Sequence, residues 1–247
     1  TYYLSTREIQ SWIVSQAVGA TMPNLNTGIL SSIPFHGPEK PEQEMAANVL
    51  SAIEDKIELN NRISAELEAM AKTLYDYWFV QFDFPNANGK PYKTSGGKMV
   101  YNPTLKRDIP EGWEAGTLED LGQIVGGSTP STQSPENFTT EGTPWITPND
   151  LSNNQGNKFI SRGRQDVSAE GIKSASLKKY PAGTVLLSSR APIGYMAISR
   201  NEVTTNQGFK SFIPNKGYSS EFIYYTVNNS LKAITQYASG STFKEVS

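Results

Sequence analysis

The stretch that decides the fold is residues 42–80, EQEMAANVLSAIEDKIELNNRISAELEAMAKTLYDYWFV, which contains neither glycine nor proline. Its apolar residues recur mostly three or four positions apart, as they do on one face of a helix. We call this set the apolar stripe; it consists of Val49, Ile53, Ile57, Ile63, Leu67, Met70, Leu74 and Trp78. A continuous helix of this length would extend roughly 58 Å. One stripe on so long a helix needs a partner helix, so we predict one long coiled-coil helix over residues 39–84.

The composition narrows the functional classes. The 247 residues include no cysteine and one histidine, His36. These counts exclude disulfides, thiolate metal sites, cysteine nucleophiles and a histidine cluster within one chain, so we expect no metal and no cofactor. The sequence has no run of 18 apolar residues and no signal-peptide pattern, so we expect a cytoplasmic protein without a membrane partner.

Charge is distributed unevenly along the chain. The net charge is −2, but residues 42–80 carry eight acids and three bases, a local charge of −5. Residues 155–216 carry ten bases and three acids, a local charge of +7. This segregation indicates two surfaces with different partners. An alternative interpretation stays open, in which a solvated acidic helix lies beside a fold with a few spare lysines.

The regions that flank the helix differ in character. Residues 85–112 form a linker rich in Asn, Gly, Lys and Pro. In residues 113–247 short apolar runs alternate with turn clusters, and a helix is predicted at 222–237. The sequence therefore predicts an α+β (mixed α/β) fold, with a strand-rich globular domain and one long helix. The aromatic residues at the helix end are expected to pack against that domain, with partner docking as the alternative; they are Tyr75, Tyr77, Trp78 and Phe79.

Residues 1–38 are interpreted as the C-terminal part of a similar globular domain, with a helix at 7–17 and a short strand at 29–34. The two ends of the chain support this interpretation, because similar residues recur in the same order and at nearly the same spacing. The matching sets are Tyr2-Tyr3-Leu4, Ile9, Gln16 and Gly19-Ala20-Thr21, and Tyr224-Tyr225-Thr226, Leu231, Gln236 and Gly240-Ser241-Thr242. Two explanations stay open: residues 1–38 are a piece of a second copy, or they complete the fold of residues 113–247 by circular permutation.

Six short signatures follow one another in the last 140 residues or so. They are Ile109-Pro110-Glu111-Gly112-Trp113, Gly126 to Ser131, Pro144 to Leu151, Pro181 to Gly194, Asn206-Gln207-Gly208, and Gly240 to Ser247. In this order they resemble the target recognition domain of type I restriction–modification specificity (S) subunits. Upstream, Ile33-Pro34 followed by Pro41 to Glu44 and a long helix is similar to the helical spacer of that family. The chain departs from the family in having one complete recognition domain, one helix and a stub.

The resemblance implies a non-catalytic subunit that reads one half of a bipartite target in double-stranded DNA. Such a subunit binds methyltransferase (M) subunits and recruits restriction (R) subunits through them. A chain with one recognition domain would form a homodimer through the long helix, each copy reading the same half-site. Two-fold symmetry would then give a palindromic split target.

Candidate DNA contacts are of two kinds, because cations and hydroxyls hold phosphates whereas Arg, Lys, Asn, Gln and Ser reach base edges. Arg190 follows Ser188 and Ser189 at the end of an apolar run, and an internal salt bridge is its alternative role. Asn206 and Gln207 suit adenine, with a tight turn as the alternative. The remaining candidates could instead be ordinary turn or surface residues; they are Ser128, Thr129, Thr132, Arg162, Arg164, Lys173, Lys210, Ser241, Thr242 and Lys244.

Three other classes of protein match the sequence less well. A methyltransferase needs an Asn/Asp-Pro-Pro-aromatic tetrapeptide, which the sequence lacks. A metal-dependent DNA endonuclease would use a cluster such as Asp150, Asp166 and Glu170, but no acid-x-Lys stands in a predicted strand. A coiled-coil scaffold unrelated to DNA explains the helix and leaves the six signatures unexplained. We expect no catalytic residue.

Overall fold

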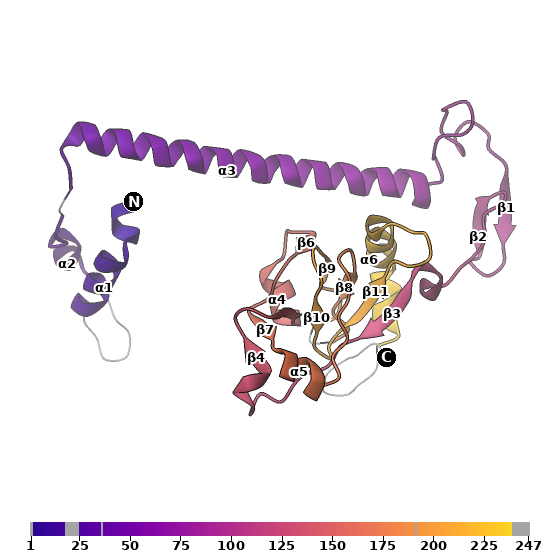
Figure 1. The fold of residues 1–247 in the computed structure, drawn as a ribbon. Helices are drawn as coiled ribbons and strands as arrows, with labels where there is room; N and C mark the ends of the chain where they lie inside the picture. The colour runs from indigo at the N-terminus through magenta and orange to yellow at the C-terminus, as the bar shows by residue number, and fades with distance from the viewer. Residues whose placement is uncertain (1, 18–24, 36, 191, 239–247) are drawn as a thin grey trace. The chain divides into compact units, whose positions relative to one another are not determined.

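The computed structural model describes residues 2–17, 25–35, 37–190 and 192–238 (Figure 1). It divides into two compact units, Thr1–Ile63 and Ser64–Ser247, and the long helix runs from one into the other. None of the helices in these described ranges is both long and apolar enough to span a membrane.

The first unit begins with two short helical segments, η1 (Tyr2–Ser5) and α1 (Arg7–Gln16), and α1 confirms the predicted helix. The strand predicted at 29–34 is wrong, because α2 (Thr27–Ser31) occupies its first half. The side chain of Asn26 accepts a hydrogen bond from the Ile29 amide at 2.9 Å and so caps α2. This local cap outweighs the strand preference of the short apolar run.

The long helix α3 spans Lys40–Tyr75 and confirms the prediction. Pro41 lies in its first turn, where the missing amide costs no hydrogen bond. A π-helical turn, η2 (Asp76–Val80), ends the run. The seven aliphatic residues of the apolar stripe, Val49 to Leu74, are between 44% and 66% exposed in the described chain.

The predicted linker is more ordered than its composition indicated. It contains an antiparallel hairpin made of β1 (Met99–Asn102) and β2 (Arg107–Pro110). The side chain of Asn102 accepts hydrogen bonds from the next two free amides, those of Thr104 and Leu105, both at 3.0 Å. Hairpin turns are usually recognised in a sequence by a glycine, and here an Asx turn takes its place. The two strands were therefore not predicted.

The second unit contains two larger sheets, and it confirms the α+β fold. The five-stranded sheet has the order β3 (Gln123–Gly126), β11 (Lys210–Ile213), β8 (Val185–Leu187), β9 (Met196–Ser199) and β6 (Phe159–Ile160). The four-stranded sheet has the order β10 (Thr204–Thr205), β5 (Thr143–Ile146), β7 (Gln165–Val167) and β4 (Phe138–Thr139). The helical segments are η3 (Leu118–Leu121), η4 (Pro135–Asn137), α4 (Pro148–Asn153), α5 (Ala169–Ser174) and α6 (Ser220–Gln236).

The central strand β8 explains how the core is divided. Leu186 packs into one apolar cluster with Ile146, Tyr180 and Phe209. Its neighbours Val185 and Leu187 point to the opposite face and pack under α6, which Figure 1 shows beside this sheet. Both faces of the strand are therefore buried, so its sequence is a continuous apolar run rather than an alternating one.

Candidate nucleic-acid interface

Three of the sequence signatures meet at one edge of the second unit. We call residues 126–132, 188–190 and 206–208 the loop cluster. The Ser128 amide donates to the Thr205 carbonyl at 3.0 Å, and the Ser189 amide donates to the Gly208 carbonyl at 2.8 Å. The hydroxyl of Thr129 lies against the side-chain oxygen of Gln207. Segments that are far apart in the sequence thus form one surface.

Where these loops touch, Gly127 leaves no room for a side chain and Gly208 leaves little. A Cβ on Gly127 would lie 2.2 Å from the carbonyl oxygens of both Thr205 and Asn206. A Cβ on Gly208 would lie 3.3 Å from Cγ of Pro148 and 3.5 Å from Cγ of Arg190. Pro148 belongs to a fourth signature, the one at 144–151. The glycines of these motifs therefore serve close packing of the loop cluster.

Two predicted DNA contacts, Ser188 and Ser189, are fully buried. The Ser188 hydroxyl donates to the Pro192 carbonyl at 2.8 Å and accepts from the Tyr195 amide at 2.9 Å. The Ser189 hydroxyl is buried without a hydrogen-bond partner among the described residues. The two serines are therefore part of the buried interior beneath the loop, whereas the sequence suggested that they lie at the surface.

Asn206 forms a tight turn, as the alternative interpretation of its motif held. Its side-chain oxygen accepts from the Gly208 amide at 2.9 Å, and its own amide donates to the Ile146 carbonyl at 3.1 Å. The turn leaves Gln207 exposed at its tip, next to exposed Thr129. Gln207 is thus the amide of this motif that points to solvent.

The other predicted contacts of the loop cluster are accessible to different degrees. Arg190 is half-buried beside Gly208 and takes part in interactions within the protein. Lys210 is half-buried at the start of β11, opposite Gly126. Thr132 is exposed, and Ser128 is half-buried with its carbonyl accepting from the Trp145 indole at 3.1 Å. Three further candidates lie outside the described residues; they are Ser241, Thr242 and Lys244.

The remaining basic candidates come from other elements. Arg162 and Arg164 lie in the segment before β7, and Lys173 is exposed on α5. The guanidinium of Arg162 pairs with the buried carboxylate of Asp166 at 2.7 Å. An internal ion pair therefore engages Arg162, while the side chains of Arg164 and Lys173 are exposed.

The acids weighed as a nuclease centre have structural partners. One oxygen of Asp150 accepts from the Thr147 amide and hydroxyl at 2.8 and 2.6 Å, which caps α4, and the other accepts from the Arg164 amide at 2.8 Å. Asp166 accepts from the Gly142 amide at 3.0 Å as well as from Arg162. Across the described ranges, no group of three or more His, Cys, Asp and Glu side chains is arranged to hold a metal ion.

Sequence reasoning missed a polar network that joins the end of α3 to the strand-rich domain. We call it the helix joint. The ammonium of Lys158, whose side chain is 11% exposed, lies 2.7 Å from the Glu68 carboxylate and donates to the Tyr225 hydroxyl at 2.8 Å. That hydroxyl donates to the other Glu68 oxygen at 2.6 Å. Burial and the neighbouring carboxylate raise the pKa of Tyr225, which keeps it a proton donor.

Aromatic packing continues the helix joint. The hydroxyls of Tyr75 and Thr226 lie 2.9 Å apart, and the rings of Phe79 and Phe222 meet edge to face with centroids 4.9 Å apart. The expected packing of the helix-end aromatics is thereby confirmed for Tyr75 and Phe79. Lys158 belongs to the basic run at 155–216 and Glu68 to the acidic run at 42–80. The opposite charges of these two runs are the sequence signal for their pairing.

Comparisons with known proteins agree on one family. The family model described as type I restriction modification DNA specificity domain matches residues 1–69 and 110–247. The MjaIX specificity subunit of a type I restriction enzyme from Methanocaldococcus jannaschii is 46% identical over 143 residues, covering 56% of this chain and 32% of the relative. The HindI specificity subunit from Haemophilus influenzae is 26% identical, covering 93% of this chain and 60% of the relative.

One solved structure is also similar to this chain. It is the HsdS subunit from Thermoanaerobacter tengcongensis, with 19% identity, a TM-score of 0.42, and coverage of 96% of this chain and 55% of that one. The chain therefore spans between about a third and three fifths of the length of these relatives.

Proposed function

Because the chain belongs to the family of type I restriction modification DNA specificity domains, we propose that it reads the sequence of one half of a bipartite target in double-stranded DNA. The observation that carries this proposal is the loop cluster, which gathers three separate signatures at one edge of the second unit. Gln207 and Arg190 are the side chains there with the chemistry for base edges, since amides suit adenine and guanidinium suits guanine. Thr129 and Thr132 offer hydroxyls for phosphates.

The domain organisation that we propose assigns each region a role. Residues 39–84 form the spacer and residues 113–247 the recognition domain, with the hairpin segment 85–112 connecting them. Residues 1–38 are the end of a second recognition domain. The internal repeat supports this assignment, because Tyr2–Ser5 and Arg7–Gln16 are helical like their counterparts in α6.

The long helix is the proposed assembly element. The exposed apolar stripe suits a second long helix, and in a homodimer an identical stripe would cover it. The target would then consist of two symmetric halves. Methyltransferase subunits are the proposed direct partners, and restriction subunits join through them. The chain itself supplies recognition without catalysis, in the cytoplasm.

The test is DNA binding by the full 247-residue chain assembled with methyltransferase subunits, compared on target and scrambled duplexes. The assembly should prefer the target, and its affinity should fall steeply with salt. Arg190→Ala should weaken binding to the target by about 1–3 kcal/mol and leave the fold intact. Arg200→Ala is the matched control, because Arg200 is stacked over Phe159 with a guanidinium-to-centroid distance of 4.5 Å.

Four outcomes would contradict the proposal or a part of it. Equal affinity for all duplexes would remove sequence recognition, and unchanged affinity of the Arg190→Ala variant would remove that residue's role. Cleavage of DNA by the chain with magnesium but without partners would instead indicate the endonuclease alternative. Binding to neither DNA nor methyltransferase would indicate a scaffold.

A further inference from the structure

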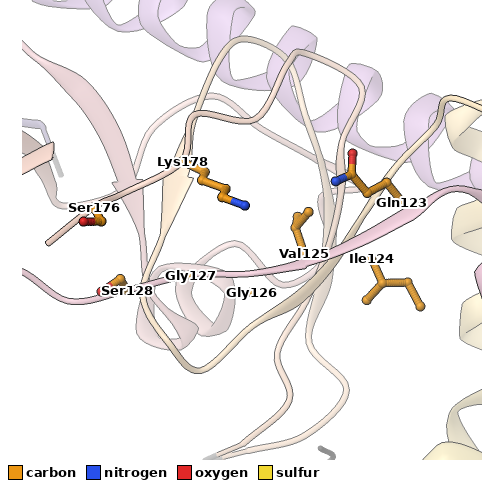
Figure 2. Close-up of a pocket in the computed structure, with 8 residues that line it drawn as sticks. All are labelled: Gln123, Ile124, Val125, Gly126, Gly127, Ser128, Ser176 and Lys178. Atoms are coloured by element: carbon orange, nitrogen blue, oxygen red, sulfur yellow. The ribbon is translucent and has the colours of Figure 1, made fainter. Parts of the chain in front are cut away.

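A polar cavity of about 280 Å³ opens along strand β3, next to the loop cluster (Figure 2). The polar residues that line it are Lys178, Gln123, Ser128 and Ser176, and residues 124–127 complete the wall. In Figure 2 the Lys178 side chain lies beside β3 and points in the direction of Val125 and Gln123. The lining offers one ammonium, an amide and two hydroxyls, and it contains no carboxylate. Such a set of donors fits an anion with several acceptor oxygens.

The charge of Lys178 is available to such a ligand. Its neighbour Lys179 pairs with Glu202 at 3.0 Å. Within the part of the chain that the structure describes, no ion pair involves Lys178, and its side chain is exposed. A lysine that faces a cavity without a carboxylate partner has no internal anion that competes with an incoming one.

The backbone holds Lys178 in place from both sides. Leu177 is buried, and its amide donates to the Ile172 carbonyl at 2.9 Å. Tyr180 is buried and exchanges two backbone hydrogen bonds with Val203, at 2.8 and 3.0 Å. Its hydroxyl donates to the carbonyl of Gly126, which lines the cavity. The backbone of the cavity wall is therefore held in place, and binding of an anion requires ordering of the exposed side chains alone.

We propose that this cavity receives a backbone phosphate of the DNA, with Lys178 as the cation. The inference rests on the proposed function, because Ser128 belongs both to the cavity and to the loop cluster that reads the bases. A phosphate held here fixes the register of the duplex against the loop cluster and carries no sequence information.

The experiment measures affinity against salt concentration for the wild-type assembly, Lys178→Ala, Lys178→Arg and Lys179→Ala, on target and scrambled duplexes. Loss of one phosphate contact lowers the slope of log affinity against log salt by about 0.9. Between about 50 and 200 mM salt, Lys178→Ala should therefore lose about 3.5-fold less affinity than the wild type. It should weaken binding to both duplexes by the same factor, whereas Lys178→Arg and Lys179→Ala should keep the wild-type slope.

The outcomes separate this inference from the proposed function. A wild-type assembly that prefers its target, combined with an unchanged slope for Lys178→Ala, overturns the phosphate site and leaves the recognition role standing. A loss confined to the target duplex would make Lys178 a base contact and would also overturn it. Wild-type binding without sequence preference removes the proposed function and this inference together. Inorganic phosphate at millimolar concentration should compete equally with both duplexes, and failure to compete contradicts the site.

Discussion

Two faces of the last turns of α3 differ in what they contact. Glu68 and Tyr75 meet Lys158, Tyr225 and Thr226 and form the helix joint. Leu67, Met70 and Leu74 lie on a face about 120° away around the helix and are 59%, 66% and 48% exposed. The polar and aromatic residues therefore have partners within the chain, whereas the aliphatic residues do not among the described ranges.

This difference indicates what kind of contact each face of the helix requires. A carboxylate and a tyrosine hydroxyl require directed partners, and the strand-rich domain supplies them at defined distances. The aliphatic residues of the apolar stripe can pack against any complementary apolar surface, and a second helix with the same spacing provides one. In the proposed assembly, the helix holds its own domain with one face and packs against a second helix with the other.

The largest expected effect concerns the exposed face. Leu67→Asp should weaken helix-mediated association by at least about a hundredfold, because a charge within an apolar interface costs about 3 kcal/mol. Sedimentation equilibrium of the full chain measures the association. Ala69→Asp adds the same charge two positions later, on the opposite side of the helix, and should leave association unchanged. Equal behaviour of the two variants would contradict the proposed interface.

The second effect concerns the joined face. Glu68→Ala leaves the nearly buried ammonium of Lys158 without its carboxylate, which should lower the free energy of unfolding by about 2 kcal/mol. Urea denaturation measures this change. The control is Glu44→Ala, since the Lys40–Glu44 pair at 3.7 Å is exposed on both sides and should contribute less than about 0.5 kcal/mol. If both variants lowered the free energy of unfolding by the same small amount, the Glu68–Lys158 pair would contribute no more than an exposed ion pair.

The smallest expected effect concerns the hydrogen bonds between Asp83, just after the long helix, and Thr94. The hydroxyl and amide of Thr94 donate to Asp83, and these bonds lower the pKa of the Asp83 carboxyl below its usual 3.8. A lowered folded-state pKa gives stability that is present above pH 3.8 and is lost as the pH falls through the folded-state value. Asp83→Asn should therefore be less stable than wild type at neutral pH, with the difference shrinking in acid.

Thermal unfolding from pH 7 to pH 3 checks this pH dependence. Asp108→Asn changes an exposed carboxylate on β2 and should follow the wild-type profile. A difference between wild type and Asp83→Asn that stays constant across this range would show that the Asp83 carboxylate does not supply the stability.

Much of the fold followed from periodicity. The long helix and α6 were predicted because their apolar residues repeat at helical spacing over many residues. The hairpin at 99–110 and the helix α2 were missed because each depends on one asparagine side chain, Asn102 or Asn26, that bonds to nearby amides. Such local bonds override the pattern of a short segment.

The candidate site was predicted only as separate motifs. The sequence contained every loop of the cluster, but their meeting depends on sheet pairing between distant strands, such as β3 with β11. The sequence also did not show which residues of these motifs are exposed. Ser188 follows the buried run Val185 to Leu187 and is itself buried, although its polar side chain suggested a surface position. The helix joint was missed because Glu68 and Lys158 belong to different regions of the sequence.

The most direct measurement is a map of methylated DNA in cells that carry this chain together with a methyltransferase subunit of the same system. Our account predicts a modified motif of two short specified halves separated by unspecified bases at a constant distance, with identical inverted halves when two copies of the chain assemble. Methylation at sites that share no sequence, or loss of the motif's dependence on this chain, would contradict it.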